Sequence, residues 1–129
     1  MPVLTFRADN RLVDKVTVVT KTFMRYECLK RFLKSAQLFY PGIRVVVADD
    51  SPTKYRETLN VADFPHVSQY FMPEFTGWFA GRALVISQVE TDFFVWVDDD
   101  FVFNTETDLQ YMLDVIESTG LKNEFILKL

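Results

Sequence analysis

Short apolar runs alternate along the chain with stretches in which apolar residues recur at helical spacing. Three runs, at residues 16–20, 45–48 and 93–97, are rich in β-branched and aromatic residues. Uninterrupted runs of this kind are typical of strands that are buried on both faces of a parallel sheet. A weaker alternation at residues 67–71 and a final apolar stretch at residues 125–129 predict two further short strands.

Apolar positions three and four residues apart predict helices between these strands. The first helix starts at Arg25 and ends at the Pro-Gly pair of residues 41–42, and the last helix follows a capping sequence at residues 105–108. The expected core positions are Leu29, Phe32, Leu33, Ala36 and Phe39 in the first helix, and Leu109, Met112, Leu113 and Ile116 in the last.

Three other segments have a less regular pattern. Residues 77–89 are apolar on several sides, so we expect a largely buried helix there. Residues 53–64 are polar and predict a loop with at most one helical turn, whereas residues 1–14 predict an irregular lead-in. The resulting order of strands and helices predicts an α/β fold, with a mainly parallel sheet between two helical layers.

Two of the predicted strands end in acidic residues. Residues 93–97 are followed by Asp98, Asp99 and Asp100, and residues 45–48 are followed by an acid pair. Acids at strand ends often only terminate the strand. Three adjacent carboxylates repel one another, however, and need a cation or positive partners. We expect Trp96 and Val97 to fix these acids at the sheet edge by packing.

The spacing of the acids indicates a phosphate-linked metal site. Alternation along an extended strand places Asp98 and Asp100 on one side and Asp99 on the other. Two carboxylates so arranged suit Mg²⁺ or Mn²⁺ that carries a phosphate. Asp49 and Asp50 could form a simple turn, or they could hydrogen-bond a base or ribose in the same cleft, because parallel strands end at one edge.

Basic residues near the same edge have two interpretations. A helix N-terminus attracts phosphate, so Arg82 could pair with one there. The alternative is close packing of a buried helix through its glycines, Gly77 and Gly81, with Arg82 at the surface. Thr20, Lys21 and Arg25 could line the same cleft, although surface charge is the expected role of Lys21 and Arg25.

Composition excludes several classes of function. The 129 residues carry a formal net charge of −4 without a basic cluster, so we expect no nucleic-acid partner. One cysteine, Cys28, and one histidine, His66, leave no zinc spacing or nucleophile triad. The sequence has no glycine-rich phosphate loop. We expect no signal peptide and no membrane segment in these residues.

Four phrases together carry a family resemblance: VTVVTKTF, RVVVADDSP, MPEFTGWFAGRALVISQV and FFVWVDDDFVF. They resemble the β-1,4-N-acetylgalactosaminyltransferases, which belong to the family 2-like glycosyltransferases, over residues 16–119. The resemblance implies a GT-A-like three-layer sandwich that binds a nucleotide-diphosphosugar. It also implies that residues 1–129 form one domain, the donor-binding portion of a truncated enzyme.

The resemblance also implies an activity. The expected reaction transfers N-acetylgalactosamine from UDP-GalNAc, or a related UDP-sugar, to a glycan acceptor on a glycolipid or glycoprotein. The expected outcome is inversion at the anomeric carbon, with Mn²⁺ or Mg²⁺ as cofactor and the Golgi lumen as location.

Residue roles follow from the resemblance position by position. Asp98 and Asp100 match acids that contact the ribose and coordinate the metal on the diphosphate. Asp50, with Asp49 beside it, matches the acid that reads the uracil or ribose. The implied donor-binding set is Thr20, Asp49, Asp50, Arg82, Asp98 and Asp99, and the implied metal ligands are Asp98 and Asp100.

Two departures from the family pattern qualify these expectations. Ala83 follows Arg82 where the pattern usually has asparagine. The chain ends at Leu129, before the half that in the family supplies the acceptor site, the catalytic base and a late metal-binding histidine; His66 is in the wrong place to replace it. An alternative is therefore a partial donor-binding fragment that associates with a full-length relative as a non-catalytic partner.

A phospho-acceptor receiver domain is a third hypothesis, since it is also a small α/β domain with acids around Mg²⁺. Such a domain needs an acid pair after its first strand. This chain has Thr20, Lys21 and Thr22 at that place.

Overall fold

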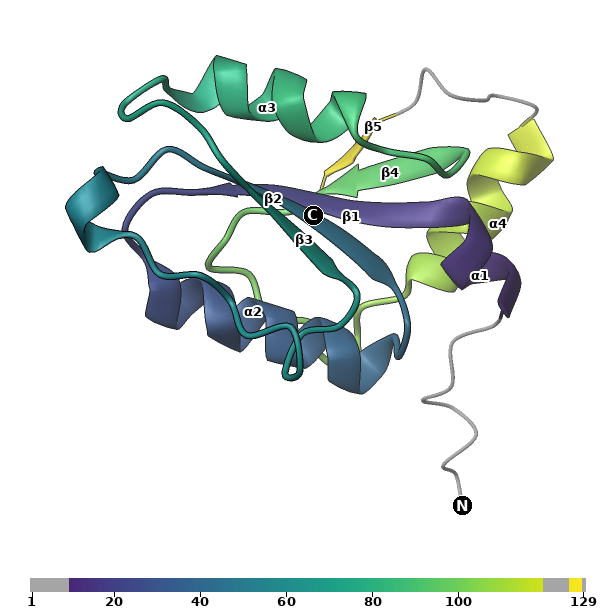
Figure 1. Ribbon diagram of the computed structural model, residues 1–129. Helices are drawn as coiled ribbons and strands as arrows, with labels where there is room; N and C mark the ends of the chain where they lie inside the picture. The colour runs from purple at the N-terminus through teal and green to yellow at the C-terminus, as the bar shows by residue number, and fades with distance from the viewer. Residues whose placement is uncertain (1–9, 120–125, 129) are drawn as a thin grey trace.

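The computed structural model describes residues 10–119 and 126–128, which form a parallel sheet with helices on both faces (Figure 1). Along the chain its strands are β1 (Val16–Thr22), β2 (Arg44–Asp49), β3 (Val67–Phe71), β4 (Phe93–Trp96) and β5 (Ile126–Lys128). Their order in the sheet is β3-β2-β1-β4-β5, and each adjacent pair is parallel. The predicted α/β fold is therefore confirmed.

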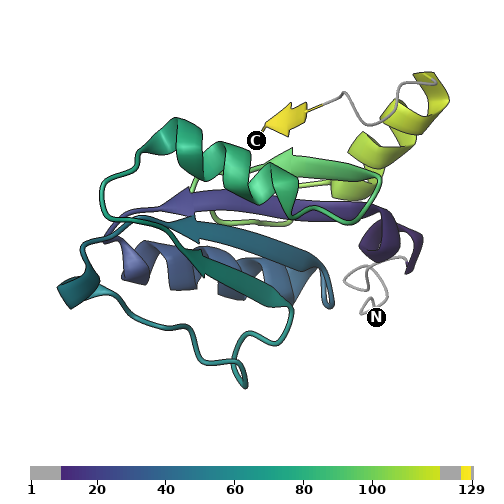
Figure 2. The ribbon, with the colours of Figure 1, turned by 45° about the horizontal axis from the view of Figure 1, so that its top comes forward.

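Helices cover the two faces of the sheet unequally. The helices are α1 (Asn10–Lys15), α2 (Tyr26–Phe39), α3 (Trp78–Ser87) and α4 (Leu109–Thr119), with a short 3-10 turn η2 (Thr53–Tyr55). Figures 1 and 2 show α2 and α3 on opposite sides of the sheet. Side chains of α1 and α4 join the core on the α2 face, so the expected three layers are present.

Helix α2 forms the larger core because its apolar positions fall on one stripe. Leu29, Phe32 and Leu33 are fully buried against Val18 and Val47, which point from the sheet toward this helix. The helix ends at the Pro-Gly turn as predicted, since the glycine after it has a φ of +87°, a value that L side chains rarely adopt.

Helix α3 is less buried than its sequence suggested, so that prediction is wrong. Only Gly81 and Val85 of this helix are buried, whereas Trp78 is 44% and Phe79 is 82% exposed. Its inner side packs on a smaller cluster that includes Trp96. The apolar residues on several sides of α3 therefore reflect an aromatic surface, not a second buried face.

The other elements agree with the pattern, with one exception. The strand at residues 67–71, the single turn at residues 53–55 and the helix capped by Asp108, whose carboxylate accepts the Tyr111 N–H at 2.9 Å, are confirmed. The exception is α1, which occupies part of the predicted irregular lead-in; residues 1–9 lie outside the described residues. Leu12 is 1% exposed, so burial of one side chain stabilises a helix too short to show a period.

The strand order fixes where a ligand can bind. The chain steps from β1 to β2 and β3 on one side, and then returns to place β4 and β5 on the other side of β1. Ligands of open α/β sheets bind outside the carboxyl ends of the strands at such a reversal. Receiver-like domains have the order 2-1-3-4-5, so the observed order argues against the receiver hypothesis.

Within residues 10–119 and 126–128, no helix is both long enough and apolar enough to span a lipid bilayer.

The core on the α2 face predicts a clear difference between two leucines of the same helix. Leu29 is fully buried and Leu38 is 64% exposed. Replacing Leu29 with alanine should lower the free energy of unfolding by about 2–5 kcal/mol, because it removes buried atoms and leaves a cavity. The matched change at Leu38 should cost less than about 0.5 kcal/mol. Urea denaturation would measure both, and equal losses would contradict this packing.

Candidate functional site

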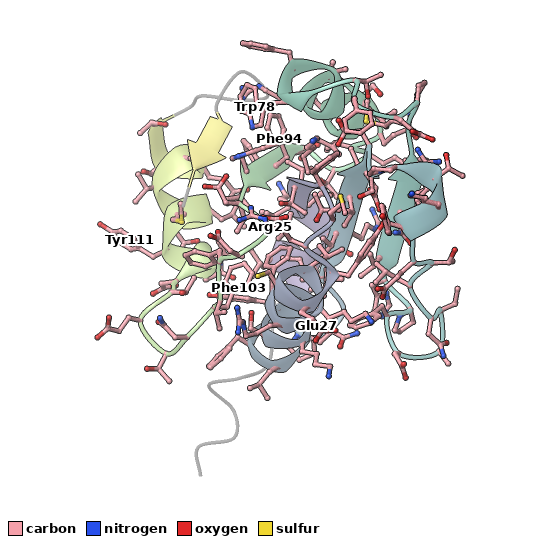
Figure 3. The ribbon with its side chains drawn as sticks, turned by 90° about the vertical axis from the view of Figure 1, so that its left-hand side faces the viewer. Arg25, Glu27, Trp78, Phe94, Phe103 and Tyr111 are labelled. Carbon is pink, nitrogen blue, oxygen red and sulfur yellow. The ribbon has the colours of Figure 1, made fainter. Side chains whose placement is uncertain are left out.

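The acidic residues meet at the carboxyl edge of the three central strands. Thr22 of β1 is opposite Asp49 of β2, and Val19 of β1 is opposite Trp96 of β4. Figure 3 views this edge with Arg25 near its centre and Trp78, from the start of α3, above it. The two acid groups predicted from sequence therefore share one edge of the sheet.

The three acids after β4 face different ways, as strand alternation predicted. Asp99 is 1% exposed, whereas Asp98 and Asp100 are both exposed. The hydroxyl of Thr22 donates a hydrogen bond to Asp99 at 2.8 Å, and Arg25 forms an ion pair with the same carboxylate. Burial raises the pKa of Asp99, while the Thr22 and Arg25 contacts oppose that increase.

Arg25 belongs to this site although it was expected only to add surface charge. Its side chain is half exposed, but its guanidinium pairs with Asp99 and lies 3.9 Å from Asp100. The negative charge of Asp99 raises the pKa of Arg25 further above its usual value. Arg25 thus supplies a fixed positive charge to the acid run.

The buried carboxylate of Asp49 accepts hydrogen bonds from three residues of the protein. The Tyr26 hydroxyl donates to it at 2.5 Å, the Ser51 backbone N–H donates at 2.9 Å, and Gln69 donates a longer bond of 3.4 Å. Ser51 in turn accepts the backbone N–H of Met24 at 2.8 Å. This geometry favours a role for Asp49 in holding the loops after β1 and β2.

Asp50 is held in place by a lysine that we expected at the surface. Lys21 lies 2.5 Å from one carboxylate oxygen of Asp50, and the Gly77 backbone N–H donates to the other at 2.8 Å. The lysine side chain is only 12% exposed, so the surface expectation is wrong for Lys21. A Cβ at Gly81 would come within 2.5 Å of its Cγ, which explains glycine there as close packing.

The side chains of Thr20 and Arg82, both predicted to contact the donor, are packed within the protein. Thr20 is fully buried, and strand alternation directs its side chain to the α2 face. The guanidinium of Arg82 lies over the rings of Trp78 and Trp96, 5.5 Å and 5.8 Å from their centroids. It is therefore neither a free surface charge nor a residue of the first helical turn.

Sequence reasoning missed most of the residues that hold the acids. Thr22, Arg25 and Tyr26 are partners of acids that lie 23 to 77 positions away, so local pattern gives no signal for them. Trp96 did carry a signal, because it lies two positions before Asp98 and must share its side of the strand.

The acid pair fits a cation that arrives with a phosphate. Among the described residues, no group of three or more acid, histidine or cysteine side chains is arranged to hold a metal by itself. Asp98 and Asp100 instead offer two exposed carboxylates, and Mg²⁺ commonly binds proteins through one or two carboxylates plus substrate phosphates. His66 is at the opposite edge, where its carbonyl accepts the Val45 N–H.

The Tyr26–Asp49 bond predicts a pH-dependent contribution to stability. Burial and the contact with Asp49 raise the pKa of Tyr26. At pH 7, Tyr26→Phe should lower the free energy of unfolding by about 1–3 kcal/mol, because it removes the shortest hydrogen bond to the buried Asp49 carboxylate and leaves one of its oxygens with only the long bond from Gln69.

The difference between wild type and Tyr26→Phe should shrink as pH rises above about 10, the usual pKa of tyrosine. The unfolded wild type then loses its phenolic proton while the folded protein still holds it, which favours unfolding. Denaturation series at pH 7 to 11 would measure this. A difference that stays constant or grows would contradict the assignment.

Comparison with known proteins supports the fold and gives the family. The crystal structure of TarS from S. aureus matches with a TM-score of 0.65 at 24% identity, over 82% of this chain and 20% of that one. Beta-1,4 N-acetylgalactosaminyltransferase 1 of Mus musculus is 50% identical over 114 residues, 88% of this chain and 20% of the relative. The Homo sapiens protein of that name is 48% identical over 82% of this chain and 19% of its own length.

A second mouse relative, beta-1,4 N-acetylgalactosaminyltransferase 2, is 46% identical over 88% of this chain and 21% of its own length. The chain thus spans about a fifth of the length of the curated relatives it matches. The family model described as glycosyl transferase family 2 matches residues 17–124, which contain every acid of the site. The chain therefore belongs to glycosyl transferase family 2 and resembles its β-1,4-N-acetylgalactosaminyltransferases.

Proposed function

We propose that this chain binds the nucleotide-sugar donor of a transferase that moves N-acetylgalactosamine from UDP-GalNAc to a glycan acceptor on a glycolipid or glycoprotein. The observation that carries the proposal is the exposed pair Asp98 and Asp100, which lies where the strand order reverses while Asp99 is turned inward. The similarity to relatives named for N-acetylgalactosaminyl transfer supports the choice of sugar.

In this proposal, Asp98 and Asp100 hold Mn²⁺ or Mg²⁺ together with the diphosphate. The bound cation would offset the negative charge that develops on the UDP leaving group. Arg82 presents a further positive charge on the α3 face, where the two indoles limit its motion. Arg25 offsets the charge of Asp99 and so limits repulsion within the acid run.

Asp50 is proposed to read the base or ribose from the second strand. Each carboxylate oxygen can accept two hydrogen bonds, so the contacts with Lys21 and Gly77 leave acceptor capacity for a ligand. Asp49 would act indirectly, by holding the turn that carries Asp50, and Thr20 would contribute through its backbone.

Donor binding is proposed for this segment, and sugar transfer with inversion for the longer protein or assembly in which it acts. This division is favoured by coverage of about a fifth of the relatives' length. None of the site residues described above is proposed as the general base. By the resemblance, the Golgi lumen is the proposed location, and a full-length relative is a possible partner.

Metal-dependent binding of UDP tests the proposal. Calorimetry should detect UDP binding in the presence of MnCl₂ and much weaker binding with a chelator. Asp100→Ala should weaken the metal-dependent binding at least about ten-fold, because one of two carboxylate ligands is removed.

Asp92→Ala is a matched control, since Asp92 is an exposed acid immediately before the same strand, at its opposite end. Its UDP affinity should equal that of wild type. Failure of wild type to bind UDP with Mn²⁺, or equal effects of the two substitutions, would reject the proposed site. Comparing UDP-GalNAc with UDP-GlcNAc would test the proposed sugar.

A further inference from the structure

Trp96 is the last residue of β4, and its indole reaches the first acid of the run. The residue is 2% exposed, and its Nε1–H donates a hydrogen bond to Asp98 Oδ1 at 3.3 Å. An indole N–H can only donate, and a buried one usually needs a partner. The two residues lie on the same side of the strand because they are two positions apart.

Contacts on the α3 face fix the orientation of this indole. The ring of Trp78 meets it edge to face, with 5.5 Å between centroids, and the Arg82 guanidinium lies over both rings. Val85 and Phe94 belong to the same packed cluster. Figure 3 shows Trp78 and Phe94 on the α3 side of the sheet. The direction of the Trp96 N–H is therefore set by packing before any ligand binds.

Asp98 depends on this one bond. Within residues 10–119, the Trp96 indole is the only hydrogen-bond or ion-pair partner of the Asp98 carboxylate. Asp99, by contrast, is held from the other face by Thr22 and Arg25. Neighbouring acids of one run are thus oriented by different layers of the fold.

We propose that Trp96 is a positioning residue for Asp98: its N–H takes up Oδ1, so that Oδ2 is the oxygen that would hold the cation bound with the diphosphate. Donors that hydrogen-bond a ligating carboxylate fix its orientation and contribute to metal affinity. The inference rests on the proposed function in one respect, namely that Asp98 is a metal ligand. It adds that the orientation of that ligand is set inside the protein, by the bond from Trp96.

The chain offers a matched pair of variants, because Trp78 and Trp96 are its two tryptophans. Trp96→Phe keeps an aromatic ring and removes the donor to Asp98, whereas Trp78→Phe makes the same chemical change without touching that bond. In calorimetric titrations with Mn²⁺ and UDP, Trp96→Phe should weaken binding about ten-fold, the lower end of outer-shell effects. Trp78→Phe keeps a ring against Trp96 and leaves the donor to Asp98 in place, so it should weaken binding less than Trp96→Phe; equal losses would overturn the inference.

A double variant separates positioning from general loss of structure. If Trp96 acts through Asp98, Trp96→Phe should cause no further loss of Mn²⁺–UDP affinity in an Asp98→Ala background. An equal loss in both backgrounds would show a merely structural role and overturn the inference. Unchanged affinity in Trp96→Phe, together with weakened binding in Asp98→Ala, would also overturn it while leaving the proposed function intact. Absence of metal-dependent UDP binding in wild type would overturn both.

Nuclear magnetic resonance keeps the inference testable if Trp96→Phe does not fold. In ¹⁵N-labelled Trp78→Phe protein, the remaining indole N–H signal belongs to Trp96. Asp98→Ala should shift this signal in the absence of ligand. With UDP present, Mg²⁺ should shift it and paramagnetic Mn²⁺ should broaden it. A signal that responds to neither the substitution nor the metals, in a protein that binds them, would reject the role of Trp96.

Discussion

Three carboxylates are buried at the carboxyl edge of the sheet, and the segment of residues 21–26 supplies a partner to each of them. Lys21 pairs with Asp50, Thr22 and Arg25 hold Asp99, and Tyr26 donates to Asp49. A buried charge without a partner is strongly destabilising. The turn from β1 into α2 is therefore what allows acids to stand at the ends of β2 and β4.

Backbone hydrogen bonds and a pair of aromatic rings fix the shape of the loops around these acids. Met24 has a φ of +62° and Phe75 a φ of +58°, both in the left-handed region that non-glycine residues seldom occupy. The Met24 N–H bonds to the Ser51 hydroxyl, and the Phe75 N–H bonds to the Asp50 carbonyl. The rings of Phe23 and Phe75 then meet 5.5 Å apart, which joins the loop after β1 to the loop before α3.

The sequence pattern predicted those features that depend on neighbouring residues, namely the strands and the side of the strand on which each acid lies. Runs such as residues 93–97 have the composition of buried strands, and alternation correctly separated Asp99 from Asp98 and Asp100. The burial of α3 was overestimated because periodicity reports how many sides are apolar but not what covers them. The sequence predicts surface charge for Lys21 and Arg25 because their partners lie 29 and 74 residues away and meet them only once the strand order is set.

The distribution of partners also separates acids whose charge the fold compensates from acids that it leaves largely uncompensated at the surface. Asp49, Asp50 and Asp99 have donors or cations within the protein and are at most 2% exposed. Asp98 has a single neutral donor, and Asp100 is 3.9 Å from an arginine that is already paired with Asp99. These two exposed carboxylates therefore keep little compensating charge from the described residues. This imbalance follows directly from the alternation of β4, which turns one acid of the run inward and leaves its two neighbours at the surface.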